Sequence, residues 1–202
     1  MRAALLLALL LPAAALASAP PPLVLPMPGT VPNQPRPVVP RGRDYYFDRS
    51  LSAVWWNPQP GVPLSRIEVR LSTLKLYAFQ GDALVGIAPV STGKEGHSTP
   101  TGRYKVLEKD PNHHSTEYGG FYNAKGDLLE ANATPTMTPP EGAHYEPAPM
   151  PNFLRLTWDG VGLHAGYLPG YAASHGCIRL PKGFSKDLYD AVTVDTPVDI
   201  VP

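Results

Sequence analysis

The chain has 202 residues, enough for one domain with extensions. Its 17 basic and 17 acidic side chains balance, so nothing in the composition favours nucleic-acid binding, which generally needs a basic surface. The chain is rich in proline and has a single cysteine, Cys177, which excludes an intrachain disulfide.

Residues 1–19 are predicted to be a secretory signal peptide. Arg2 supplies the positive start, residues 3–11 are apolar, and small residues follow around Ala17 and Ala19. A retained anchor is the alternative, but the apolar run is shorter than the ~20 residues that span a bilayer. We therefore expect secretion across the inner membrane to the periplasm or cell envelope, with no stable membrane insertion after signal cleavage.

Two further segments precede the domain. Residues 20–43 are dense in proline, which lacks a backbone donor, so we expect an extended tether. Residues 44–64 contain aromatic groups at 45–47 and 55–56, which are too apolar for a free linker. We interpret residues 44–64 as an aromatic strap that packs on the domain. A platform that stacks on sugar rings is the alternative.

Residues 65–202 are predicted to form an all-β domain. Ile67, Val69 and Leu71 alternate with charged residues, which is typical of a half-buried strand. Further strands are expected at 74–79, 83–90, 102–107, 153–158, 161–164 and 198–201, and one amphipathic helix at 184–192. Short strands between Gly, Asp and Pro turns indicate a sandwich or barrel.

Residues 110–151 contain seven prolines and show no clear periodicity. Irregular stretches of this length inside a compact domain are usually functional or disordered. We therefore expect a long, lid-like loop that closes over the substrate or forms one wall of its site.

Cys177 follows His175 and Gly176, and His164 lies thirteen positions upstream. A nearby imidazole can take the proton of a thiol and lower its pKa by several units, which makes the sulfur a nucleophile for acyl transfer. The glycine lets backbone amides approach a carbonyl oxygen as an oxyanion hole.

Two other interpretations of these residues remain. The first is that Cys177 is a buried structural cysteine, which is common in soluble domains. The second is a zinc site formed by His164, His175 and Cys177, although zinc sites usually show closer paired spacing and a fourth ligand. No metal and no other cofactor is expected.

Two motifs, SHGCIRLP at 174–181 and GLHAG at 162–166, resemble the L,D-transpeptidase catalytic domain, also called YkuD. Two more blocks are similar to that family and occur in its order: VSTGKEGHSTPTGRYKV at 90–106 and DTPVDI at 195–200. The resemblance implies a YkuD-like β-sandwich or flattened barrel with one packed helix.

The resemblance also implies roles for individual residues. Cys177 would be the nucleophile, His164 the general base and acid, and the backbone carbonyl of Ala165 would orient His164. The backbone amides of His175, Gly176 and Cys177 would form the oxyanion hole. The implied substrate-binding residues are Ser174, His175, Arg179 and Tyr167.

The implied reaction is acyl transfer on peptidoglycan stem peptides. A tetrapeptide stem loses its terminal D-alanine, becomes a thioester on Cys177, and passes to an amine, giving 3→3 crosslinks or attachment of an outer-membrane protein. A hydrolase on the same scaffold and a non-catalytic wall-binding module are the alternatives. Only nine residues separate His164 from Ser174, a shorter segment than the family pattern, so the acceptor stays open.

Overall fold

In the computed structural model, residues 54–202 are described. The predicted signal peptide, the tether and residues 44–53 of the strap lie outside the described residues. Among residues 54–202, no helix is long and apolar enough to cross a membrane.

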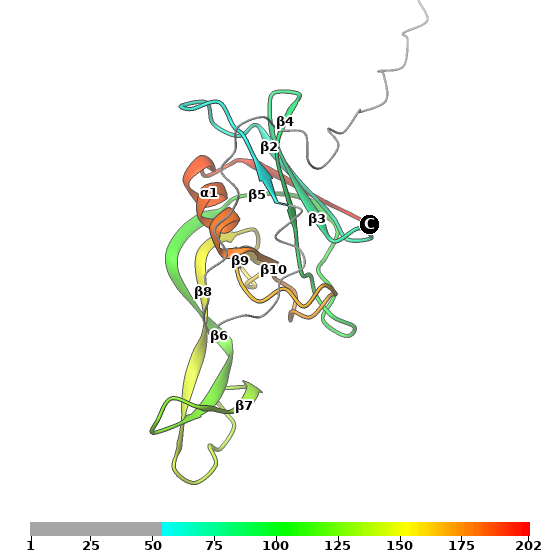
Figure 1. Ribbon diagram of the computed structural model, residues 1–202. Helices are drawn as coiled ribbons and strands as arrows, with labels where there is room; N and C mark the ends of the chain where they lie inside the picture. Colours follow the sequence, from blue (N-terminus) through cyan, green and yellow to red (C-terminus); the bar gives the residue numbers. More distant parts are fainter. Residues whose placement is uncertain (1–53) are drawn as a thin grey trace, which may run out of the picture. The chain divides into compact units, whose positions relative to one another are not determined.

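Two curled β-sheets and one helix make up this part of the chain (Figure 1). The first sheet has the order β1-β4-β3-β2-β11-β5. Its strands are β1 (Trp55–Trp56), β2 (Arg66–Arg70), β3 (Lys75–Gln80), β4 (Ala83–Pro89), β5 (Gly102–Lys105) and β11 (Pro197–Val201). β11 pairs in parallel with β2, and the remaining pairs are antiparallel.

The second sheet has the order β10-β9-β8-β6-β7. Its strands are β6 (Glu108–Asn123), β7 (Leu128–Ala133), β8 (Ala143–Arg155), β9 (Gly162–Ala165) and β10 (Ile178–Leu180). β9 and β10 are parallel, and the other pairs are antiparallel. The helix α1 (Lys182–Ala191) follows β10 directly. The predicted fold class, all-β with one packed helix, is confirmed.

The core lies between the sheets and α1, because the apolar residues of each strand alternate toward it. Ile67 and Val69 of β2 are fully buried, as are Leu163 of β9 and Leu188 of α1. Burial of one such side chain contributes roughly 1.5–3 kcal/mol. The alternation that predicted the strand at Ile67 and Val69 is therefore the same pattern that fills the core.

The described end of the strap packs on the first sheet. Trp55 and Trp56 form β1 on the edge of β4, opposite Ile87 and Gly86. A Cβ at Gly86 would lie 2.6 Å from the Trp56 ring, so this glycine makes room for the indole. The Trp56 ring also meets Phe184 of α1 edge-on, with 5.2 Å between centroids.

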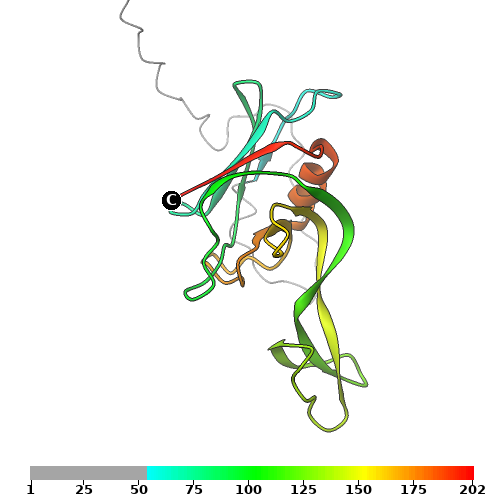
Figure 2. The same cartoon turned by 180° about the vertical axis from the view of Figure 1, so that it is seen from behind.

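The prediction of an irregular loop at 110–151 is wrong. Most of this segment forms β6, β7 and β8, and β6 pairs with β8 along nearly their whole length. In Figures 1 and 2 the outer half of this hairpin extends away from the first sheet, with β7 beside its far end. Only 134–142, with Pro135, Pro139 and Pro140, is an irregular connection of the kind that was expected.

The prolines of β8 explain the error. Pro147, Pro149 and Pro151 are two residues apart, so their nitrogens face the same edge of the strand. Along the described strands, β9 pairs only with Leu154 and Arg155 of β8, which leaves that edge of the proline segment without a partner strand. Proline is tolerated at such an edge because no ladder donor is needed there.

Candidate active site

The parallel pairing of β9 and β10 brings the predicted nucleophile and base together. Leu163 lies opposite Ile178 and His164 opposite Arg179, and the two apolar residues are fully buried. Because side chains alternate along a strand, His164 and Arg179 occupy the other face. Cys177 immediately precedes β10, two residues from Arg179, and lines the same cavity as both.

Two hydroxyl groups hold the loop that carries the nucleophile. Ser174 Oγ accepts a hydrogen bond from the Gly176 amide at 3.1 Å and donates to the Cys177 carbonyl at 2.5 Å. Thr99 Oγ1 donates to the Gly176 carbonyl and accepts from the Gly93 amide, both at 2.8 Å. Gly176 has φ +122°, a conformation that favours glycine. The position of Cys177 is therefore fixed from both sides of Gly176.

These contacts differ from two expectations. The amide of Gly176 is occupied by Ser174, which leaves the amides of His175 and Cys177 as our candidates for the oxyanion hole. Ser174 lines the cavity but is only 1% exposed, and its hydroxyl is used on the loop backbone. We therefore assign Ser174 to positioning of the loop rather than to contact with substrate.

His164 is buried and held in one tautomer. Its Nδ1 lies 2.8 Å from the carbonyl oxygen of Ala165, so Nδ1 carries the proton and Nε2 keeps its lone pair. Burial lowers the pKa of His164 to about 4; the Ala165 carbonyl opposes this, and the charge of Arg179 adds to it. The resting imidazole is therefore neutral at pH 7.

The thiol of Cys177 is also in its neutral form at rest. Its Sγ lies 3.2 Å from the carbonyl oxygen of Gly160. Burial raises the pKa of Cys177, while the amide of Gly162 and the charges of Arg179 and Arg155 act in the opposite direction. The expected lowering of the thiol pKa by an imidazole is not what this site shows, because burial of both groups favours a neutral pair.

A cavity of about 850 Å³ joins these residues to the β6–β8 hairpin. Of the predicted site residues it is lined by His164, Tyr167, Ser174, His175, Cys177 and Arg179. Further lining comes from β6, β7 and β8 of the same sheet, including His113, Tyr118, Leu128 and Arg155. The segment expected to form a lid or wall therefore forms a wall, although as strands.

An aromatic group connects that wall to the nucleophile loop. The His175 ring stacks on Tyr118 with 4.2 Å between centroids, and His97 meets it edge-on at 4.8 Å. Burial, together with the charges of Lys94 and His97, lowers the pKa of His175 to about 4. His175 is thus packed in place as a neutral ring.

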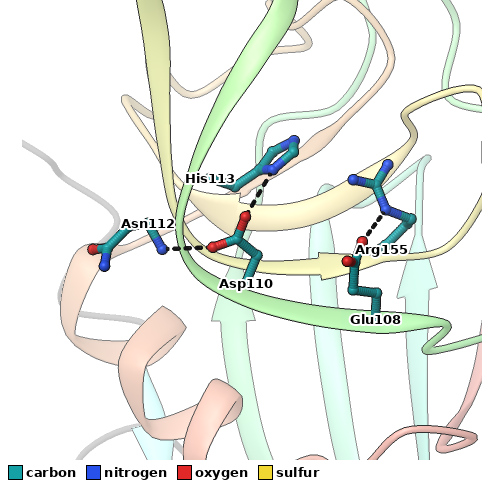
Figure 3. Close-up of polar contacts among 5 residues, drawn as sticks. All are labelled: Glu108, Asp110, Asn112, His113 and Arg155. Atoms are coloured by element: carbon teal, nitrogen blue, oxygen red, sulfur yellow. Dashed lines mark hydrogen bonds and ion pairs between the residues drawn. The ribbon is translucent and has the colours of Figure 1, made fainter.

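An ion pair and a histidine–carboxylate contact lie side by side on β6 and β8 (Figure 3). Arg155 Nε lies 2.6 Å from Glu108, and His113 Nδ1 lies 3.1 Å from Asp110. The Asn112 amide also donates to Asp110 at 3.0 Å, which lowers the pKa of Asp110 together with His113 and Arg155. His113 and Tyr118 were not predicted as site residues, because their strand lacks a clear period-two pattern. Arg155 lies within the strand predicted at 153–158, but no motif there indicated a site.

The zinc alternative finds no support among residues 54–202, where no group of three or more His, Cys, Asp or Glu is placed to hold a metal ion. The described residues form an all-β domain whose cavity contains the buried thiol of Cys177, the neutral imidazole of His164 and the guanidinium of Arg179. The chain belongs to the YkuD family, the L,D-transpeptidase catalytic domain, whose family model matches residues 65–200.

Curated relatives include L,D-transpeptidase 1 of Mycobacterium tuberculosis, 28% identical over 165 residues that cover 69% of this chain and 59% of that protein. Another is the probable L,D-transpeptidase YcfS of Escherichia coli, 30% identical over 174 residues that cover 79% of this chain and 52% of that protein. This chain therefore matches only between half and three-fifths of the length of these relatives.

Solved structures show the same fold. An L,D-transpeptidase from Mycobacterium smegmatis aligns with a TM-score of 0.52 at 21% identity, covering 69% of this chain and 59% of that one. L,D-transpeptidase LdtMt1, in a complex with imipenem, aligns with the same TM-score, identity and coverage. At this identity the likeness concerns the fold alone.

Proposed function

We propose that this protein is a cysteine-dependent L,D-transpeptidase of the bacterial cell envelope. The observation that carries the proposal is the arrangement of Cys177, His164 and Arg179, which the β9–β10 register places along one cavity. Family membership supports the same activity. The donor is a peptidoglycan tetrapeptide stem, and the acceptor is an amine.

In the first half-reaction the thiol of Cys177 attacks the carbonyl before the terminal D-alanine. His164 Nε2 takes the thiol proton as the C–S bond forms, which suits a neutral imidazole beside a neutral thiol. The oxyanion faces the amides of His175 and Cys177; one such donor contributes about 3–4 kcal/mol to the transition state. The C–N bond then breaks, and His164 returns the proton to the departing amine.

Arg179 supplies positive charge beside the reacting carbonyl. Burial lowers the pKa of its guanidinium, and Cys177 opposes this effect. We assign Arg179 to a carboxylate of the donor stem, because an anion there recovers the stabilisation that burial removes. Tyr167, 54% exposed at the cavity, is assigned to the outer part of the stem.

In the second half-reaction an amine attacks the thioester, a C–N bond forms, and the C–S bond breaks. A diamino-acid side chain as acceptor gives a 3→3 crosslink, and a lysine of an outer-membrane protein gives protein attachment. Water in the same place gives hydrolysis. The predicted signal peptide is consistent with a periplasmic site of action.

The test uses tetrapeptide muropeptides and product analysis by mass spectrometry. Wild type is expected to release D-alanine and to form dimers, and Cys177→Ala is expected to do neither. Dimers from Cys177→Ala would contradict the proposal, whereas loss of D-alanine without dimers would identify the hydrolase. Incubation with imipenem is expected to add one drug mass to wild type alone, because ring opening leaves the acyl group on Cys177. A non-catalytic wall-binding module would acquire no such adduct.

A further inference from the structure

A second histidine lines the cavity from β6, a strand of the same sheet as β9 and β10. His113 of β6 lines the cavity that also contains His164 and Cys177. Its side chain is 17% exposed, and its Nδ1 lies 3.1 Å from Asp110 Oδ2. A carboxylate on Nδ1 fixes the tautomer and leaves Nε2, on the far side of the ring, as a proton acceptor. Figure 3 shows Asp110 beneath the ring.

Packing holds this ring in place. His113 stacks on Phe153 with 4.2 Å between centroids and 18° between planes. Phe153 is fully buried and lies 6.3 Å from the His164 ring by centroids, so one aromatic side chain contacts both imidazoles. The titratable and charged groups around the His113–Asp110 pair are Arg155 on β8, which acts on Asp110, and His164 on β9, which His113 influences electrostatically.

We propose that His113, oriented by Asp110, is a second catalytic base that takes a proton from the amine that attacks the thioester. This inference rests on the proposed acyl-transfer function and deepens it, since it names the base of the second half-reaction. The aspartate–histidine pair on β6 and the thiol–histidine pair then carry out the two proton transfers in one cavity.

The other groups of the cavity are less suited to this role. His164 is directed to the thiol by its bond to Ala165. His175 is packed between Tyr118 and His97, which holds its ring on the nucleophile loop. Glu117 and Asp159 line the cavity as solvent-exposed carboxylates.

His113 Nε2 takes one proton from the ammonium ion of the acceptor, which leaves a free amine. The amine nitrogen forms the C–N bond to the thioester carbonyl, and the C–S bond breaks with its electron pair on Cys177 Sγ. The nitrogen gives a second proton to solvent, and the sulfur takes one from solvent to restore the free thiol. His113 then releases its own proton to solvent. An acceptor that is already a free amine needs no proton removed by His113.

The test compares two acceptors with the full chain and a tetrapeptide donor. D-methionine is an ammonium ion at pH 7 and needs a base, whereas hydroxylamine is already a free amine. His113→Gln is expected to slow transfer to D-methionine by about 100-fold, the lower range for a general base. First-turnover release of D-alanine, formation of the hydroxamate and acylation by imipenem are expected to stay within about twofold of wild type. Asp110→Asn is expected to slow D-methionine transfer by a smaller factor.

His114 provides the matched control, because it is the neighbouring histidine, is exposed, and does not line the cavity. His114→Gln is expected to match wild type with both acceptors. Unchanged D-methionine transfer in His113→Gln would overturn the inference. The inference would also be overturned if His113→Gln and Asp110→Asn both lost transfer to the two acceptors and acylation to the same extent. The pair would then support the structure of the whole site rather than one proton transfer. If wild type releases no D-alanine, the proposed function itself fails.

Discussion

The Nδ1 atom of His164 lies 2.8 Å from the carbonyl oxygen of Ala165, the next residue of the same strand. A backbone carbonyl orients an imidazole as a side-chain acceptor would, but it carries no full charge to stabilise the protonated ring. This fits the lowered pKa of His164, about 4. The lowered pKa therefore favours a neutral His164, which suits the proposed transfer of the Cys177 proton during attack better than a permanent thiolate–imidazolium pair does.

Alkylation of Cys177 by iodoacetamide tests this directly. Because burial raises the thiol pKa, we expect the rate to rise with pH at a midpoint above that of an exposed cysteine, ~8.5. The same protein unfolded in denaturant is the control, since its only thiol is then exposed. A midpoint in the folded protein well below the unfolded value would instead indicate a thiolate–imidazolium pair.

Stability is expected to fall in mild acid. The unfolded chain protonates His164 near pH 6.5, whereas the folded chain does so only near pH 4, with its pKa at about 4. Below pH 6.5 the unfolded state thus binds more protons, and the free energy of unfolding declines down to about pH 4, by roughly 3 kcal/mol. Denaturant unfolding at several pH values measures this. His164→Gln should flatten the decline, and an unchanged slope in that variant would refute the assignment.

The hydroxyl of Thr99 is expected to be needed for the geometry of the nucleophile loop. Thr99→Val keeps the shape but leaves the Gly93 amide and the Gly176 carbonyl without their partner, at a cost of about 1–3 kcal/mol. We expect lower stability and slower acylation by imipenem. Thr101→Val is the control, because Thr101 is exposed. Equal behaviour of the two variants would show that the Thr99 contacts do not position Cys177.

Two glycines are expected to respond oppositely to substitution by alanine. A Cβ at Gly162 would lie 2.5 Å from the Phe153 ring and 2.7 Å from the Leu154 carbonyl oxygen, so Gly162→Ala should destabilise by about 1–3 kcal/mol. A Cβ at Gly183 of α1 meets no atom within 4 Å. Gly183→Ala should therefore stabilise by about 0.5–1 kcal/mol through helix propensity. Thermal unfolding of both variants decides, and a shift of the same sign would contradict the packing at Gly162.

The first sheet was predictable because its strands obey simple alternation, as at Ile67 and Val69 of β2. That Cys177 and His164 lie along one cavity was predictable from chemistry, since a lone thiol near a histidine suggests a nucleophile. The family motifs predict roles for the neighbouring residues, and these roles stay predictions.

The hairpin β6–β8 and its residues could not be predicted in the same way. Pro147, Pro149 and Pro151 suggest loop until it is known that one edge of β8 has no partner strand. His113 carries no local signal, because its role depends on pairing between strands distant in sequence. The occupation of the Gly176 amide by Ser174 likewise follows from loop conformation, which residue types alone do not fix.

The contact between Thr99 and Gly176 joins residues 77 positions apart, and Ser91 bonds the Tyr171 carbonyl across 80 positions. Closing such long loops is entropically costly, so contacts of this kind form late in folding. The nucleophile loop is therefore ordered only after both sheets have come together. Reaction of Cys177 with an active-site acylating agent is expected to report complete folding, and a partly folded chain is expected to show no such reaction.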